Sequence, residues 1–145
     1  MVGHGEDFVK TFFQRTIYNL DCYYQLNRHD NKNYPYEVTQ LVNSFLGLIV
    51  FVNEDRRKIG DNFYDKVKGK IEIWTYTDKH NSKAFLRHLR NSIAHKGLSE
   101  TVDEENTIIA LTFEDKYRGN EFKITLFVEE IRELISEIKN EILSD

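Results

Sequence analysis

The sequence contains one cysteine, one proline and seven glycines, and each of these scarcities excludes a class of protein. A single thiol, Cys22, cannot form an intramolecular disulfide framework and argues against a zinc site built from thiolates. We therefore expect a reducing compartment, the cytoplasm. Scarce proline and glycine leave no flexible linker, and no repeat or low-complexity stretch divides the 145 residues. We predict one domain spanning residues 1–145.

The chain also lacks long hydrophobic runs and an excess of positive charge. The longest apolar run, residues 45–52, is far too short to cross a bilayer, and the amino-terminal residues do not resemble a secretory signal. We expect no membrane contact. The formal net charge of −4 excludes the basic surface of a sequence-independent nucleic-acid binder. Lysine and arginine still cluster at 56–70, 79–90 and 95–96, so any contact with RNA has to be local.

Hydrophobic residues three and four positions apart predict two long helices at the start of the chain. They cover residues 7–29 and 36–53, and turn-forming residues at 30–35 separate them. The second helix is apolar almost all round, so it must be buried on more than one side. Packing within the chain and packing against a second subunit both fit this pattern.

A third helix is delimited by its terminal residues rather than by its length. Asn81 or Ser82 can cap its start, and Gly97 is the predicted stop. The preceding residues 54–81 carry a charged stretch and a short β-like alternation, but no long periodic pattern. We expect loop and short irregular structure there.

The last third of the chain mixes strand and helix signals. Residues 107–113 and 121–127 are β-prone runs around a turn, which predicts an antiparallel hairpin. Residues 127–142 have the spacing of a closing amphipathic helix. The predicted fold is mainly α, an antiparallel four-helix bundle with a β-hairpin inserted between the third and last helices.

One face of the predicted third helix is hydrophobic, and the opposite face is mainly polar. At about 100° per residue, its core stripe consists of Phe85, Leu86, Leu89 and Ile93. Its opposite face consists of Ala84, Arg87, His88, Asn91, Ala94 and His95. Arg90 lies about 140° from His95 on this ideal wheel, so something must bring the two together. The arginine can wrap around the helix, the last turn can loosen, or a second copy can pool the residues across a two-fold axis.

Arginine, asparagine and histidine in one short segment suit the cleavage of an RNA phosphodiester. Attack by a ribose 2′-hydroxyl needs a proton carrier that works near neutral pH, and His95 is the natural candidate. Arg90 can stabilise charge on the phosphate oxygens, and Asn91 can orient His95 or bind an oxygen. This chemistry needs no metal or cofactor. The same residues also occur together by chance, and His88 fits either a second active-site imidazole or a solvated neighbour.

Two segments resemble a known family. Residues 85–97, Phe-Leu-Arg-His-Leu-Arg-Asn-Ser-Ile-Ala-His-Lys-Gly, resemble the signature helix of the HEPN superfamily, in which an arginine and a polar residue precede a histidine. The match falls on Arg90, Asn91 and His95. Residues 38–50 look like the second helix of a bacterial and plasmid-borne HEPN subgroup. The resemblance implies a helical bundle, a homodimer that pairs two motifs in one cleft and, in many members, metal-independent endoribonuclease activity.

The resemblance also implies roles for individual residues. Arg90 would stabilise the phosphate or the transition state, Asn91 would be a positioning residue, and His95 would transfer protons. Arg87, His88 and Lys96 are the candidate substrate-binding residues, and no metal ligand is implied.

Three hypotheses about function follow. The first is a dimeric, metal-independent endoribonuclease acting on RNA in a toxin–antitoxin, phage-defence or stress response, with an antitoxin or regulatory protein as a further partner. The second is a catalytically inactive HEPN module that binds a nucleotide or a partner protein through the same cleft. The third is a helical interaction domain whose motif is coincidental. Only the first two require the His95 residues of two chains to converge.

Overall fold

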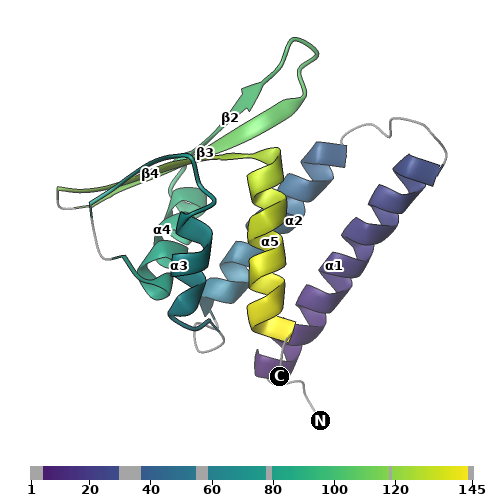
Figure 1. The fold of residues 1–145 in the computed structure, drawn as a ribbon, viewed down its shortest axis with the longest axis horizontal. Coiled ribbons are helices and arrows are strands. Elements are labelled where there is room, and N and C mark those ends of the chain that lie inside the picture. Colours follow the sequence, from purple (N-terminus) through teal and green to yellow (C-terminus); the bar gives the residue numbers. More distant parts are fainter. Residues whose placement is uncertain (1–4, 30–36, 55–58, 78–79, 118, 144–145) are drawn as a thin grey trace.

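The computed structural model describes residues 5–29, 37–54, 59–77, 80–117 and 119–143. The predicted turn at 30–35 lies outside the described residues. Within them the chain forms five helices and four strands (Figure 1). The helices are α1 (Gly5–His29), α2 (Glu37–Glu54), α3 (Asn62–Lys68), α4 (Ser82–Ala94) and α5 (Val128–Leu143). The strands are β1 (Ile73–Tyr76), β2 (Leu98–Val102), β3 (Ile108–Tyr117) and β4 (Asn120–Phe127).

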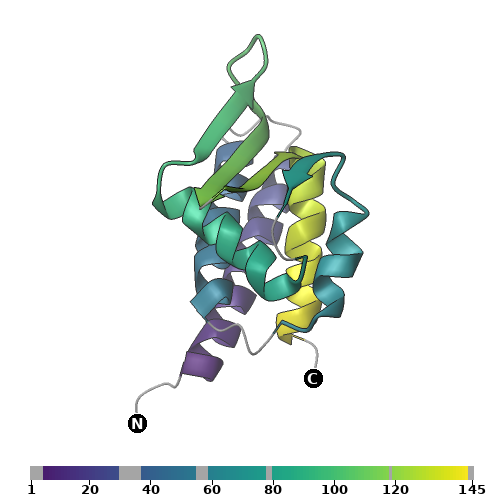
Figure 2. The same cartoon turned by 90° about the vertical axis from the view of Figure 1, so that its left-hand side faces the viewer.

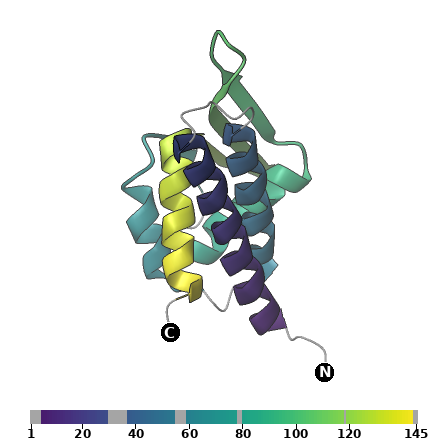
Figure 3. The same ribbon diagram turned by 90° about the vertical axis from the view of Figure 1, so that its right-hand side faces the viewer.

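The four predicted helices are confirmed as α1, α2, α4 and α5. Helices α1, α2 and α5 run side by side (Figures 1 and 3), and α4 crosses α2 obliquely (Figure 2). Because α2 contacts α1, α4 and α5, packing within the chain covers much of its broad apolar surface, although Val50 is exposed. Its buried side chains are Leu41, Val42, Phe45, Leu48 and Ile49.

The predicted fold class is wrong, because the four strands form one antiparallel sheet in the order β1-β4-β3-β2 rather than an isolated hairpin. The predicted hairpin is present at its centre as β3 and β4, which pair up to Tyr117 and Asn120. Strand β1 adds to β4, and β2 adds to β3. The hairpin of β2 and β3 extends past the helices (Figure 1). Short edge strands with mostly exposed residues give a weak sequence signal, and both added strands lie at an edge.

Residues 54–81 are not irregular as expected, since they contain both α3 and β1. Helix α3 has seven residues and buries Phe63, Tyr64 and Val67 where it contacts α4 and α5. Seven residues are too few to display a helical period. Strand β1 pairs with β4, which lies much later in the chain, so no local pattern could reveal the partner that stabilises it.

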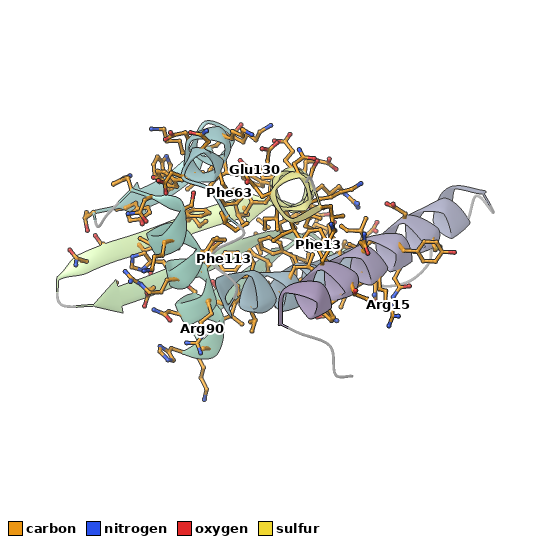
Figure 4. All side chains as sticks on the ribbon, turned by 90° about the horizontal axis from the view of Figure 1, so that it is seen from below. Phe13, Arg15, Phe63, Arg90, Phe113 and Glu130 are labelled. Atoms are coloured by element: carbon orange, nitrogen blue, oxygen red, sulfur yellow. The ribbon has the colours of Figure 1, made fainter. Side chains whose placement is uncertain are left out.

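The core lies between the inward face of the sheet and the helices. Phe113 of β3 is fully buried and meets Phe45 of α2 edge to face, with ring centroids 6.0 Å apart. Phe13, Phe63 and Phe113 point into this interior from three elements (Figure 4). Aromatic contacts connect α2 with β3, and α3 with both α4 and β1.

One row of the inward face breaks the apolar pattern. Cross-strand pairing aligns Asp115 of β3 with Phe122 of β4, and Phe122 with Tyr76 of β1. Phe122 is fully buried, and the Asp115 side chain is only 12% exposed. Because successive strand residues face opposite ways, Asp115 shares the inward face with Phe113. The sheet thus presents a carboxylate to the helix packed against it, which is α4.

Candidate functional site

Helix α4 is anchored at its start by side-chain hydrogen bonds. The Oδ1 of Asn81 accepts the backbone N–H of Ala84 at 2.8 Å, which confirms Asn81 as the cap. The buried Ser82 hydroxyl donates to the carbonyl oxygen of Gly60 at 2.8 Å and accepts the N–H of Tyr64 at 3.0 Å. These bonds tie the first turn of α4 to α3 and so fix the direction of the helix.

The end of α4 departs from the predicted glycine stop. The helix ends at Ala94, His95 is the C-cap, and Lys96 takes the left-handed conformation with φ of 61°. The N–H of Gly97 then donates to the carbonyl oxygen of Ser92 at 2.8 Å, as in a Schellman motif. Lys96 thus occupies the position that glycine usually fills.

Gly97 does not end α4, as its position in the sequence suggested, but lies where β3 comes closest to the end of the helix. A Cβ at this position would collide with the carbonyl oxygen of Glu114, and the N–H of Glu114 donates to the carbonyl oxygen of Gly97 at 2.7 Å. Gly97 therefore allows β3 to approach the end of α4 closely. The short contact holds the sheet beside His95.

The predicted polar face of α4 is narrower than the helical wheel suggested. Ala84 and His88 belong to the buried face, because α4 packs against β3 as well as α2. The sheet that the sequence did not reveal is the physical cause. Of the remaining predicted polar-face residues, Arg87, Ala94 and His95 are exposed and Asn91 is half-buried.

His88 is enclosed by the inward row of the sheet. Its Nδ1 lies 2.7 Å from Oδ2 of Asp115, its ring stacks on Phe122 at 4.9 Å, and Tyr76 meets it edge to face at 5.4 Å. The residue is 5% exposed. His88 is therefore not a solvated neighbour, and its role in substrate binding stays a prediction.

Three hydrogen bonds, of which the His88–Asp115 bond is the first, form a chain that reaches the motif. Oδ2 of Asp115 also accepts Nδ2 of Asn91 at 3.3 Å, and Oδ1 of Asn91 accepts Nη1 of Arg90 at 3.4 Å. The order of residues is therefore His88, Asp115, Asn91, Arg90. We define these four residues as the Asp115 network.

Arg90 and His95 each have a local feature that two of the three ways considered for bringing them together would need; that they meet stays a prediction. The Arg90 guanidinium turns toward Asn91, which lies on the ridge that leads to His95 at i, i+4. His95 has φ of −111° and ψ of 25°, so it has left the regular helix. Arg90 lies at one end of α4, away from the interior phenylalanines (Figure 4).

Two further candidate residues, Arg87 and Lys96, are exposed. Arg87 precedes Asn91 by one turn on the same side of α4. Lys96 lines a groove of about 540 Å³ on the outer sheet face, together with Ser99, Thr112, Thr125 and Lys123, whose Nζ lies 3.7 Å from the carboxylate of Glu114 in the same groove. Cationic and hydroxyl groups of this kind can contact phosphate and ribose.

Sequence reasoning missed Asp115 because the predicted strand ended at Phe113. Extending the two-residue alternation from Leu111 and Phe113 would have placed Asp115 on the core side. A carboxylate at a core-facing position needs a partner. That requirement was the available signal, although it does not identify His88 or Asn91 as the partners.

A second polar group lies among aromatic rings near the start of α4. The hydroxyl of Tyr64 is 2.6 Å from Nδ1 of His80, and His80 stacks on Tyr76 with ring centroids 4.4 Å apart. Burial, together with the negative charge of Asp65, raises the pKa of Tyr64 to about 12. Tyr64 therefore keeps its proton at neutral pH and can donate it to His80.

The described residues contain neither a membrane-spanning helix nor a cluster of metal-ligating side chains. No helix in this part of the chain combines the length and apolarity needed to cross a membrane. In the same ranges, no three His, Cys, Asp or Glu side chains are grouped so that they could hold a metal ion.

Comparison with known proteins gives one match. The sequence profile of the family described as HEPN pEK499 p136 matches residues 3–145. This range includes all of the described helices and strands. No curated protein sequence and no solved structure matches the chain.

Proposed function

The chain belongs to the HEPN pEK499 p136 family, and from that premise we propose that it is a metal-independent endoribonuclease whose active residues lie at the end of α4. One observation carries the proposal. The Arg90 guanidinium lies on the Asn91 amide, and His95 stands exposed at the end of the same helix. An imidazole can transfer the proton and a cation can stabilise the phosphate charge in cleavage by a 2′-hydroxyl, and an amide can bind a phosphate oxygen.

In the proposed reaction the ribose 2′-oxygen forms a bond to the adjacent phosphorus and the bond to the 5′-oxygen breaks. The products are a 2′,3′-cyclic phosphate and a 5′-hydroxyl. His95 accepts the proton of the 2′-hydroxyl. Arg90 stabilises the negative charge on the phosphate oxygens, and Asn91 holds Arg90 and the phosphate in place.

The proposed active form is a homodimer. The leaving 5′-oxygen needs a proton, and the motif contributes one histidine from each chain. Two copies that face each other through the ends of α4 would supply a second His95 as the proton donor. Arg87 and Lys96, both exposed, are the proposed phosphate contacts on either side of the cleavage point.

The proposed substrate is single-stranded RNA in the cytoplasm, and the proposed setting is toxin–antitoxin regulation, phage defence or stress. An antitoxin or regulatory protein is the further partner that such a setting implies. The net charge of −4 makes broad electrostatic binding of RNA weak. Binding would therefore depend on the local cations near α4.

The test is cleavage of labelled single-stranded RNA in excess EDTA by the wild type, Arg90→Ala and His95→Ala. Removal of the proton carrier should lower the rate roughly 100-fold or more. Lys66→Ala is the matched control, because Lys66 is an exposed lysine on α3 outside the motif. Light scattering checks the dimer.

Cyclic-phosphate ends produced by the wild type and the control, and lost in both motif variants, would support the proposal. Failure of a well-folded dimer to cleave a varied set of RNAs would contradict it. In that case, binding of a labelled nucleotide to the same dimer would favour the inactive module.

A further inference from the structure

We propose that Asp115 is a positioning residue of the active site, acting through Asn91 to orient Arg90, with His88 holding its carboxylate. The inference rests on the proposed function for its kinetic consequences, but its structural content does not. Asp115 lies outside the Arg–His motif and on a different element, β3. Three hydrogen bonds connect it with His88, with Asn91 and, through Asn91, with Arg90.

The placement of Asp115 is costly, which calls for a physical explanation. The preceding inward residues of β3, Leu111 and Phe113, are buried hydrophobic residues of the core. An apolar residue at position 115 would avoid the cost of removing a carboxylate from water. The Asp115 side chain is instead 12% exposed, and its Oδ2 pairs with His88 and Asn91. Hydrogen bonds to side chains therefore replace apolar packing at this position.

The acceptor chemistry of Asp115 determines which way the Asn91 amide faces. An ionised carboxylate only accepts hydrogen bonds, so it must receive the NH₂ group of Asn91. The 3.3 Å contact joins Nδ2 of Asn91 to Oδ2 of Asp115. This leaves Oδ1 of Asn91 directed at Arg90, whose guanidinium only donates. Asp115 thus turns Asn91 into an acceptor for Arg90.

His88 restrains the carboxylate itself. Its Nδ1 lies 2.7 Å from the same Oδ2 atom that accepts Asn91. The His88 ring is clamped between the stacked Phe122 and the edge of Tyr76, and it is 5% exposed. A ring fixed on two sides leaves its donor in one place, and that donor fixes the rotamer of Asp115.

The backbone supports the same arrangement. The N–H of Glu114 donates to the carbonyl oxygen of Gly97 at 2.7 Å, which ties the residue before Asp115 to the residue two positions after His95. The network and this backbone bond join β3 to α4 on both sides of the motif. Such a double connection keeps catalytic groups within the small tolerances that cleavage needs.

The first test is a double-mutant cycle on cleavage rates. Asp115→Ala should lower kcat about 10- to 100-fold, because a misplaced group can cost about 100-fold, while KM changes little. Asp115→Asn keeps an oxygen acceptor and should recover most of the rate. In an Asn91→Ala background, Asp115→Ala should cost nothing further, since the effect passes through Asn91.

Asp65→Ala on α3 is the matched control, since the Asp65 side chain is 69% exposed and it should leave kcat unchanged. Equal losses for Asp115→Ala with and without Asn91 would overturn the proposal. So would a failure of Asp115→Asn, correctly folded, to recover the rate.

A second measurement keeps the inference independent of activity. In NMR spectra, Asp115→Ala should shift the side-chain NH₂ resonances of Asn91 and the guanidinium resonance of Arg90. Asp115→Asn should shift them less. An Asn91 amide that is unmoved by Asp115→Ala would overturn the positioning role even if RNA is cleaved. If the wild type cleaves no RNA, the proposed function fails, and these spectra alone decide the role of Asp115.

Discussion

The carbonyl oxygen of Gly97 accepts the N–H of Glu114 at 2.7 Å, and the two backbones lie so close that a side chain at Gly97 would collide with Glu114. This contact joins the end of α4 to β3 directly beside the motif histidine. Backbone cannot move aside as a flexible side chain can. The contact therefore makes the end of α4 sensitive to a single methyl group.

Gly97→Ala should lower the free energy of unfolding by about 1–3 kcal/mol or more, because the added Cβ forces α4 and β3 apart. The same variant should lose RNA cleavage, since His95 lies at this end of the helix. The measurement is urea unfolding followed by circular dichroism.

Gly47→Ala is the control for that prediction. A Cβ at Gly47 would meet nothing within 4 Å, and Gly47 lies inside α2. Alanine there should stabilise the protein by about 0.5–1 kcal/mol. Equal effects of the two substitutions would show that the close approach at Gly97 does not constrain the fold.

Four of the five described helices were predictable, because the residues that form and delimit each of them lie in one contiguous stretch of sequence; the seven-residue α3 was not. The spacing of hydrophobic residues predicted α1, α2 and α5, and Asn81 marked the start of α4. The sheet was not predictable to the same degree. Strand β2 is mostly exposed and β1 pairs with the distant β4, so their stability comes from partners that local patterns do not reveal.

The candidate site was also predictable only in part. Arg90, Asn91 and His95 share one helix, so their spacing could be recognised, and their catalytic roles stay predictions. Asp115 lies on β3 and meets Asn91 only through folding. His88 was assigned to the polar face because a wheel for one helix cannot show that a sheet covers its second side.

Glu130 is predicted to be a structural residue that joins three elements. Its Oε1 accepts the N–H of Phe127 at 2.9 Å at the start of α5, and its Oε2 accepts the N–H of Glu72 at 3.1 Å just before β1. Glu130→Ala leaves both donors without this acceptor and should cost about 1–3 kcal/mol of unfolding free energy.

Glu129→Ala provides the comparison in the same turn. Its side chain is 84% exposed and its nearest cation is Arg132 at 3.7 Å, so the change should stay within about 0.5 kcal/mol. A loss at Glu129 as large as that at Glu130 would mean that helix charge, rather than the two hydrogen bonds, explains the effect.

Tyr64 should make stability fall at alkaline pH. Burial, with the charge of Asp65, raises its pKa to about 12 from 10.0, so the unfolded chain ionises first. The contribution is fully present below pH 10 and is lost as the pH rises toward 12. Between pH 9 and 11.5, the wild type should lose on the order of 1–2 kcal/mol more than Tyr64→Phe. Parallel pH profiles for the two proteins would contradict this assignment.

Lys96 offers a test in which stability and RNA binding should change in opposite directions. Its φ of 61° is unfavourable for a residue with a Cβ, so Lys96→Gly should raise the free energy of unfolding by about 0.5–1 kcal/mol. If Lys96 contacts phosphate as proposed, the same variant should bind RNA more weakly and with a smaller salt dependence.

The control for Lys96 is Asn106→Gly, because Asn106 has a similar φ of 64° but lies in the β2–β3 turn, away from the motif. It should change RNA binding little, and stability by less than the lysine variant, since asparagine tolerates this conformation. Both substitutions are made in the His95→Ala protein, and filter binding across a salt series then measures the affinity for RNA without cleavage. Unchanged RNA affinity in Lys96→Gly, with the stability gain present, would remove Lys96 from the binding surface and leave it as the residue that ends α4.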